Sequence, residues 1–367
     1  MVQRLPVTVL TGFLGAGKTT LLRHLLRHSG QRLAVMVNEF GSIGLDGDLI
    51  RSCGFCPEDE LEGRLVELNN GCLCCTVQDD FLPTMETLLS RADQLDGIVV
   101  ETSGLALPRP LLQALDWPAV RSRVHVNGVV TLVDAEALAA GSPVGDAAAL
   151  ERQRQQDPSL DHLTAIDELF HDQLEAADLV LISRADCVDA SELERLRTEL
   201  VGQVRTGTPI LPISHGQIEP AVVLGLQEGS DHEPPMHEPE HVEADQDHDH
   251  EHQHQHQHQD HEHHDHSHVE MVSGSVRFEG AINRIELEAQ LSELVATYQV
   301  VRLKGRVWLP GKALPLQVQM VGPRLNSWFE AAPAHAWRPV HSGVDLVVLS
   351  FDPGAERAIR DRLSSEE

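Results

Sequence analysis

Cationic residues, aromatic side chains and long apolar runs are all scarce in this sequence of 367 residues. Lys and Arg total 28 against 57 Asp and Glu, which gives a formal net charge of −29 at pH 7. Nucleic acids and anionic membrane surfaces are bound by basic patches, so this charge argues against both as partners. Aromatic residues make up only 4%, which leaves few platforms for stacking bases. No run of about 18 apolar residues is present, so we expect no membrane span.

Cysteine is also sparse, and its placement is uneven. There are six cysteines, and five of them fall within the 23 residues from Cys53 to Cys75. Such clustering is typical of thiol or metal chemistry and not of a disulfide framework. The first residues run directly into an apolar strand and a glycine-rich loop, so we expect no signal peptide. These features together predict a cytoplasmic protein with reduced thiols.

Short apolar runs alternate with helical patterns along the first 215 residues. Near-continuous apolar strands between amphipathic helices are typical of an α/β fold, in which helices cover both faces of a parallel sheet. The expected strands are residues 5–10, 33–37, 98–100, 126–133 and 179–182. The expected helices are residues 19–28, 82–92, 106–115 and 193–201.

Composition changes abruptly after this region. No Lys or Arg occurs from Thr206 to Val276, and residues 231–270 hold 14 of the 22 histidines together with 13 acidic residues. Such a tract cannot bury enough apolar surface to offset its ordering entropy, so we expect disorder. Apolar and alternating runs then return and predict a small α+β domain, with Trp308, Trp328 and Trp337 in its core. The expected organisation is a domain at residues 1–215, a linker at 216–270 and a C-terminal domain at 271–367.

The segment GFLGAGKT, residues 12–19, matches the phosphate-binding pattern G-x-x-x-x-G-K-[ST]. It follows an apolar strand and opens an amphipathic helix, so backbone N–H groups and the helix N-terminus converge on phosphate oxygens. We expect Lys18 to reach the β- and γ-phosphates and the Thr19 hydroxyl to bind Mg²⁺. The motif therefore predicts a parallel sheet of the P-loop NTPase type. The nucleotide-binding residues expected here are Gly12, Gly15, Ala16, Gly17, Lys18, Thr19 and Thr20.

A second candidate phosphate-site segment, Glu101-Thr-Ser-Gly104, directly follows an apolar run. A carboxylate at the carboxyl end of a strand in an open α/β sheet lies where ligands bind. We expect Glu101 to hold Mg²⁺ through water and the Gly104 N–H to lie near the γ-phosphate. Glu39 and Glu101 are candidates for positioning the attacking water, and with Lys18 they make up the candidate catalytic set.

Three thiols within four residues form the most unusual segment: Cys72, Cys74 and Cys75. Thiols this close deprotonate together only beside a cation, so a metal ion is their natural partner. Upstream, Cys53-x-x-Cys56 gives a spacing close to that of a closed structural zinc site. Spacing alone leaves two alternatives open, a structural zinc site or an exchangeable site completed by Glu39 or other oxygen ligands. Cys187 stands alone, and we expect it to be a buried core thiol.

These segments resemble, in their joint order, the P-loop GTPases of the CobW type. The likeness covers most of the chain outside the His-rich tract. The matching segments are Gly12–Thr20, Asn38–Gly41, Glu67–Val77, Glu101–Pro108, Arg302–Gly305 and Leu316–Gly322.

The resemblance implies a GTP-dependent metallochaperone that uses Mg²⁺ and releases its metal on GTP hydrolysis. In that family the Cys-x-Cys-Cys motif binds the metal, which corresponds to Cys72, Cys74 and Cys75 here, and Glu39 lies near metal and nucleotide. CobW-type proteins are associated with cobalt supply for cobalamin biosynthesis, and close relatives handle zinc. The implied cargo is therefore Co²⁺ or Zn²⁺, with cobalt first, and the implied partner is a client metalloenzyme or a cobaltochelatase subunit.

One segment departs from the family pattern. The guanine-reading motif is usually Asn-Lys-x-Asp, and here the corresponding residues are Ser183-Arg184-Ala185-Asp186. Asp186 keeps the acceptor for guanine N1–H and the 2-amino group, and Arg184 can stack on the base. Ser183 is shorter than Asn, so we predict a preference for GTP with weakened affinity. Ser214 matches the second guanine loop.

The His-rich tract and the overall function each leave alternatives open. The tract is interpreted as a metal reservoir for the cysteine site, as incidental weak metal affinity, or as a pH-sensitive interaction tail. The chain as a whole can also be interpreted as a His-rich metal buffer with a vestigial nucleotide site, or as a P-loop kinase. Intact Lys18, Thr19, Glu101 and Asp186 argue against the buffer, and the clustered thiols argue against the kinase.

Overall fold

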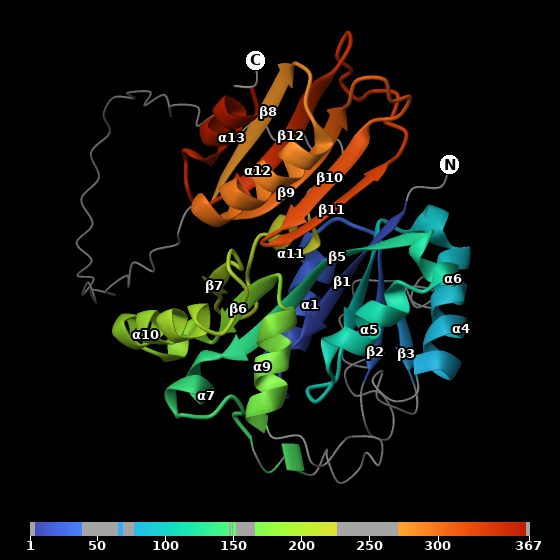
Figure 1. Ribbon diagram of the computed structural model, residues 1–367. Helices are drawn as coiled ribbons and strands as arrows, with labels where there is room; N and C mark the ends of the chain where they lie inside the picture. Colours follow the sequence, from blue (N-terminus) through green and yellow to red (C-terminus); the bar gives the residue numbers. More distant parts are fainter. Residues whose placement is uncertain are drawn as a thin grey trace, which may run out of the picture. The chain divides into compact units, whose positions relative to one another are not determined.

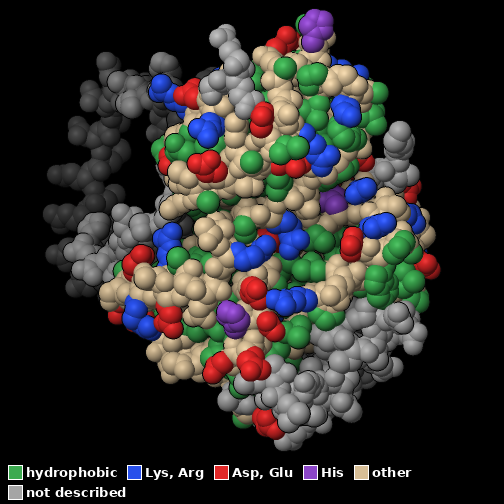
Figure 2. All heavy atoms as spheres, viewed as in Figure 1, with side chains coloured by type: hydrophobic (Ala, Val, Ile, Leu, Met, Phe, Trp, Pro, Cys, Tyr) green, Lys and Arg blue, Asp and Glu red, His purple; other side chains and the backbone are tan. Residues whose placement is uncertain are grey.

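A computed structural model describes residues 4–38, 65–68, 77–146, 148, 150–151, 166–225 and 271–364. The described residues form two sheets, a seven-stranded sheet in the N-terminal part and a five-stranded sheet in the C-terminal part (Figure 1). No helix among these residues is long and apolar enough to cross a membrane. On the face drawn in Figure 2, acidic and basic side chains are interspersed.

The seven-stranded sheet is parallel throughout, in the order β3-β2-β4-β1-β5-β6-β7. Every residue of β4 and β6 is buried, as expected where helices cover both faces of a sheet. The expected α/β fold class is therefore confirmed. The strands are β1 (Leu5–Thr11), β2 (Leu33–Asn38), β3 (Leu65–Leu68), β4 (Gly97–Glu101), β5 (Val124–Asp134), β6 (Leu179–Ser183) and β7 (Ile210–Pro212).

Helices cover this sheet through separate apolar clusters. Successive residues of a strand point to opposite faces, so Leu10 packs with the α1 leucines, whereas Val9 packs with Phe81 and Leu111. The longer helices are α1 (Lys18–His28), α4 (Val77–Ser90), α5 (Pro108–Leu115), α9 (Ile166–Ala176) and α10 (Ala190–Val201). The shorter ones are α6 (Pro118–Arg121), α7 (Ala135–Ala139), α11 (Pro220–Leu224), and the 3₁₀ turns η1 (Ala92–Gln94) and η2 (Ala185–Cys187).

The five-stranded sheet is antiparallel, in the order β11-β10-β9-β12-β8. In β10, Leu316 and Met320 join the core beneath two helices, while Gln319 is buried on the opposite face. The expected small α+β domain is confirmed. Its elements are β8 (Val272–Glu279), α12 (Arg284–Thr297), β9 (Val300–Trp308), β10 (Leu316–Val321), β11 (Arg324–Phe329), β12 (Gly343–Ser350) and α13 (Ala355–Ser364).

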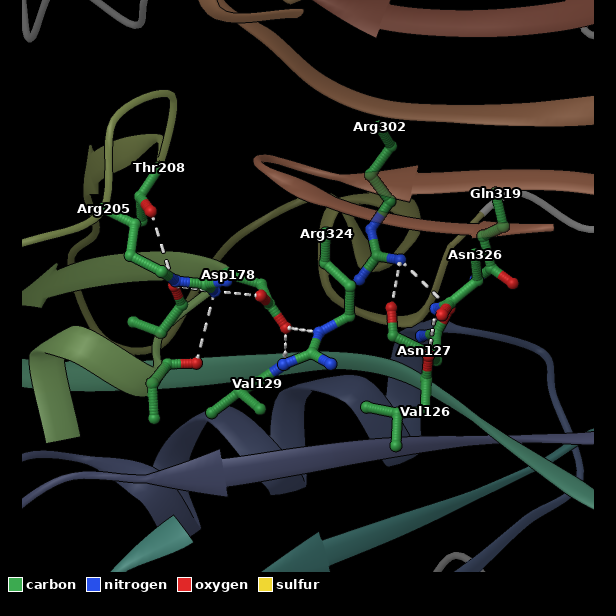
Figure 3. Close-up of polar contacts among 12 residues, drawn as sticks. Val126, Asn127, Val129, Asp178, Arg205, Thr208, Arg302, Gln319, Arg324 and Asn326 are labelled. Carbon is green, nitrogen blue, oxygen red and sulfur yellow. Dashed lines mark hydrogen bonds and ion pairs between the residues drawn. The ribbon is translucent and has the colours of Figure 1, made fainter. Parts of the chain in front are cut away.

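One buried carboxylate, that of Asp178 just before β6, joins the two sheets (Figure 3). It accepts hydrogen bonds from the backbone N–H of Val129 at 2.8 Å and from Arg324 Nε at 2.5 Å, and it pairs with Arg205 as well. Because its partners come from β5, from β11 and from the loop before β7, this single side chain ties the C-terminal sheet to the parallel sheet.

A second buried contact centres on Arg302 of β9 (Figure 3). Its guanidinium donates to the Val222 carbonyl at 2.5 Å, to Asn127 Oδ1 at 3.1 Å and to the Val223 carbonyl. Burial lowers the pKa of Arg302 to about 9. Gln319 also donates to Asn127 Oδ1. A side chain of the C-terminal domain thus donates hydrogen bonds to two backbone carbonyls of α11.

Two expectations about single residues were wrong. Cys187 is exposed and not a core thiol, because the strand β6 ends at Ser183 and Cys187 lies on the following surface turn. The three C-terminal tryptophans are half-buried and do not belong to the core. Trp308 and Trp337 form an edge-to-face pair with ring centroids 5.5 Å apart, and Trp328 lies against His125 at 4.8 Å.

Candidate functional site

The loop between β1 and α1 has the backbone of a phosphate-binding loop. Gly12 has φ +129°, and a Cβ there would lie 2.3 Å from the Leu132 carbonyl oxygen. Gly15 and Gly17 also have positive φ, of +81° and +94°. Only glycine fits at position 12, since both the space and the backbone conformation exclude a side chain.

Lys18 is held inside this loop. Its ammonium donates to the carbonyls of Gly12 at 2.8 Å and Phe13 at 3.0 Å, and the residue is buried. The N–H of Ala16 donates to the Phe13 carbonyl at 3.1 Å and so stabilises the loop itself. A cation at the N-terminus of α1 favours binding of a polyphosphate.

The segment after β4 packs directly against the loop. Thr19 Oγ1 donates to Glu101 Oε1 at 3.0 Å, and Glu101 is buried. A Cβ at Gly104 would lie 2.5 Å from the Leu14 backbone nitrogen, so Gly104 permits this close approach. A hydroxyl and a carboxylate side by side are the oxygen ligands that Mg²⁺ prefers.

The loops after β6 and β7 lie next to each other and near the start of α1. The Ala185 N–H donates to the Ile213 carbonyl at 3.2 Å, and His215 Nε2 lies 3.6 Å from Asp186 Oδ2. A Cβ at Gly216 would lie 3.0 Å from the Leu21 nitrogen. The loop that carries Ser214 is therefore adjacent to the loop of Asp186, as a nucleoside pocket requires.

Ser183 lies beneath the phosphate loop. It is buried, and its hydroxyl donates to the Val133 carbonyl at 3.1 Å. Its Cβ lies 3.5 Å from where a Cβ on Gly17 would be. Thr20 is exposed at the start of α1. The structure thus brings the expected nucleotide residues, which lie at or just after the carboxyl ends of β1, β4, β6 and β7, to the same edge of the sheet.

Sequence reasoning missed Asp134, the last residue of β5. Arg184 Nη1 lies 2.8 Å from Asp134 Oδ2 and 3.4 Å from Glu136 Oε2. Asp134 Oδ1 also caps α7 by accepting from the Glu136 and Ala137 N–H groups. The available signal was an acidic residue ending a long apolar run, because strand ends of a parallel sheet meet at the ligand edge.

The expected metal residues Glu39, Cys72, Cys74 and Cys75, and also Cys53 and Cys56, lie outside the described residues. The described residues do include β2, which precedes Glu39, and β3, which precedes the three clustered thiols. Asn38 of β2 pairs with Leu68 of β3, and Val37 pairs with Glu101 of β4. Among the described residues no group of three or more His, Cys, Asp or Glu could hold a metal ion.

Comparison with known families decides the assignment of the chain. The model of the CobW/HypB/UreG nucleotide-binding domain matches residues 6–212, and that of the cobalamin synthesis protein cobW C-terminal domain matches residues 271–365. The chain belongs to the CobW family. It is therefore a P-loop GTPase, as the resemblance implied.

Individual members of the CobW family are similar over most of this chain. A zinc chaperone CobW from Pseudomonas aeruginosa is 44% identical, with 89% of this chain and 83% of that protein covered. A zinc chaperone CobW from Sinorhizobium sp is 40% identical, with 99% and 97% covered. The solved Zn(II)-bound YjiA GTPase from E. coli is 21% identical, with 100% of both chains covered and a TM-score of 0.37.

Proposed function

We propose that this chain is a GTP-dependent metallochaperone that takes Zn²⁺ as its cargo. The proposed metal ligands are Cys72, Cys74 and Cys75, with Glu39 as an oxygen ligand. Thiolates favour zinc, cobalt, nickel and copper over magnesium and calcium. Two relatives at 40% identity or more are named zinc chaperones, which favours zinc over the cobalt that the resemblance had put first.

The register of three neighbouring strands is the observation that supports this proposal. Asn38 directly precedes Glu39, and Leu68 lies four residues before Cys72. These two strand ends are paired with each other, and the residue before Asn38 pairs with Glu101. Glu101 in turn accepts the Thr19 hydroxyl. The described strand ends that precede Glu39 and the thiols therefore lie beside the strand that carries Glu101. On this basis we expect a change in the phosphates to act on both segments.

Mg²⁺ fits the oxygen pair formed by Thr19 and Glu101, which would hold it at the phosphates. When bound, it neutralises charge on the phosphate oxygens. Lys18 supplies a second positive charge from within the loop, and Glu39 is the candidate to orient the attacking water. The buried contact of Glu101 with Thr19 favours a role in holding the cation over a role as base.

The proposed cycle is an order–disorder switch. Bound GTP orders the segments after β2 and β3 and so completes the metal site, and loss of the γ-phosphate releases them. The metal then passes to a client metalloenzyme, with the His-rich tract as a low-affinity reservoir. A full swing of this kind needs about a 10⁴-fold difference in metal affinity between the nucleotide states.

The test locates the metal and identifies it. Zn(II) and Co(II) are titrated separately into the full chain with Mg²⁺ and a non-hydrolysable GTP analogue, and into the triple variant C72S/C74S/C75S under the same conditions. The exposed thiol of Cys187 provides the control variant C187S.

We expect one tight Zn(II) site that the triple variant loses and C187S keeps, above the weak sites of the His-rich tract. Tighter binding of Co(II) than of Zn(II) would reverse the choice of cargo. A tight site that persists in the triple variant would contradict the assignment and favour a His-rich buffer.

A further inference from the structure

The ion pair between Arg184 and Asp134 lies outside the phosphate loop of residues 12–19, and Arg184 belongs to the segment that we expect to read the base. β5 and β6 are adjacent, and Asp134 pairs in register with Ser183, the residue before Arg184. Asp134 is buried at the end of its strand, whereas about half of the Arg184 side chain is exposed. The buried Asp134 carboxylate at the end of β5 thus pairs with the partly exposed guanidinium of Arg184.

The geometry points to Asp134 as a positioning residue for nucleotide binding, which sets the Arg184 side chain as a wall of the guanine pocket. This inference rests on the proposed GTP-dependent function and deepens it. Asp134 does not touch the nucleotide, and it acts through the side chain that does.

The local backbone gives Arg184 one defined starting direction. Arg184 has φ +52°, and its carbonyl accepts the Cys187 N–H at 2.9 Å. The following Ala185 is tied to the Ile213 carbonyl. The main chain of the loop is therefore fixed from two sides, and the remaining freedom lies in the long side chain of Arg184.

Asp134 removes that freedom because its own position is fixed. One oxygen, Oδ1, caps α7 through two backbone N–H groups at 3.0 and 3.3 Å, and this leaves Oδ2 aimed at Arg184. Glu136 adds a weaker contact at 3.4 Å from an exposed side chain. A guanidinium has a planar fork and a stem of methylenes, so anchoring its end leaves the stem to cover a base.

Pre-ordering this side chain raises nucleotide affinity, because binding no longer has to immobilise it. The cost of immobilising one long side chain corresponds to about 3- to 10-fold in affinity. The gain is confined to the base, since phosphate contacts come from the loop at residues 12–19. Asp134 therefore separates base affinity from phosphate affinity.

The test uses Asp134→Asn in the full chain. Asparagine caps a helix as well as aspartate does, so α7 is retained. The negative charge is lost, and an N–H₂ group replaces the oxygen that faces Arg184. The control is Asp189→Asn, the same change at the cap of α10, where Asp189 accepts the Glu192 N–H at 2.9 Å. Dissociation constants are measured for GDP and, as a probe without a base, for inorganic tripolyphosphate.

We expect D134N to weaken GDP binding about 3- to 10-fold and to leave tripolyphosphate binding unchanged, while D189N changes neither. In an Arg184→Met background, D134N should have no further effect, because the two residues act as one unit. Asp134→Ser, which also caps a helix, replaces D134N if that variant does not fold.

Two results would overturn the inference. One is a D134N protein that binds GDP as the wild type does, and the other is an equal loss with and without Arg184, which would show an effect on the fold. If R184M itself leaves GDP binding unchanged, the loop does not read the base and the proposed guanine pocket fails. The two failures are therefore distinguished by separate variants.

Discussion

Asp178→Asn tests the contact that holds the C-terminal sheet to the parallel sheet. The wild-type carboxylate is fully buried and serves two arginines and one backbone N–H (Figure 3). Asparagine has nearly the same shape, so the change leaves no cavity. It does remove the negative charge and places an N–H₂ donor where a second acceptor oxygen was.

The magnitude follows from the burial of the three partners. Removing one partner of a buried ion pair costs about 3–5 kcal/mol because the remaining charge is left uncompensated. Here Arg205 is 36% exposed and Arg324 is 24% exposed, so water partly solvates them after the change. We therefore expect the lower end, about 3 kcal/mol, which is a large share of the roughly 5–15 kcal/mol that stabilises a typical protein.

The assay is urea unfolding followed by tryptophan fluorescence. The control is Asp96→Asn, since Asp96 also accepts one backbone N–H and one arginine, Arg32, but at the surface. Exposed pairs contribute about 0–1 kcal/mol, so D96N should shift the midpoint little. Equal midpoints for D178N and D96N would refute the argument that burial makes this pair a structural clamp.

Three further outcomes are expected. Burial lowers the pKa of His125 to about 4, so the folded protein excludes a proton that the unfolded chain binds near pH 6.5. About 3 kcal/mol of stability should therefore be lost as pH falls from 6.5 to 4. In acid titrations, His125→Gln should reduce this dependence of the unfolding free energy on pH. Gly104→Ala should abolish measurable GDP binding, because its Cβ would lie 2.5 Å from the Leu14 nitrogen. Iodoacetamide should label the exposed thiol of Cys187 in the folded protein, and mass mapping locates the label. Labelling should become faster as pH rises, because partial desolvation and the Asp186 carboxylate raise the pKa of this thiol.

Much of the fold could be predicted from hydrophobic patterning, because five strands of the parallel sheet are near-continuous apolar runs. The strands β3 and β7 were not predicted, since they have only four and three residues and offer no periodicity. The edge strand β11 was not predicted for a different reason. Its residues are half-exposed, and its sequence RLNSWF shows no clear alternation of apolar and polar residues. The burial of Arg302 could not be predicted either, because the backbone carbonyls that accept its hydrogen bonds are distant in sequence.

The phosphate-loop motif could be recognised from the sequence because its residues form a contiguous pattern with one chemistry. Side-chain contacts between residues far apart in the sequence could not be predicted in this way. Asp134 and Arg184 are 50 positions apart, and only the register of β5 and β6 brings them together. Cys187 was misjudged because a lone cysteine follows an apolar strand, and the point where that strand ends decides whether it is buried.

The central claim is that nucleotide state controls metal affinity, and one measurement tests it most directly. Zn(II) affinity of the full chain is measured with Mg²⁺ alone, with Mg·GDP and with a non-hydrolysable Mg·GTP analogue, and the weak sites seen in the C72S/C74S/C75S variant are subtracted. The account predicts that Zn(II) binding tightens by orders of magnitude only with the GTP analogue. Equal affinity in all three states would contradict it, because the cysteines would then be a structural site or a plain sink.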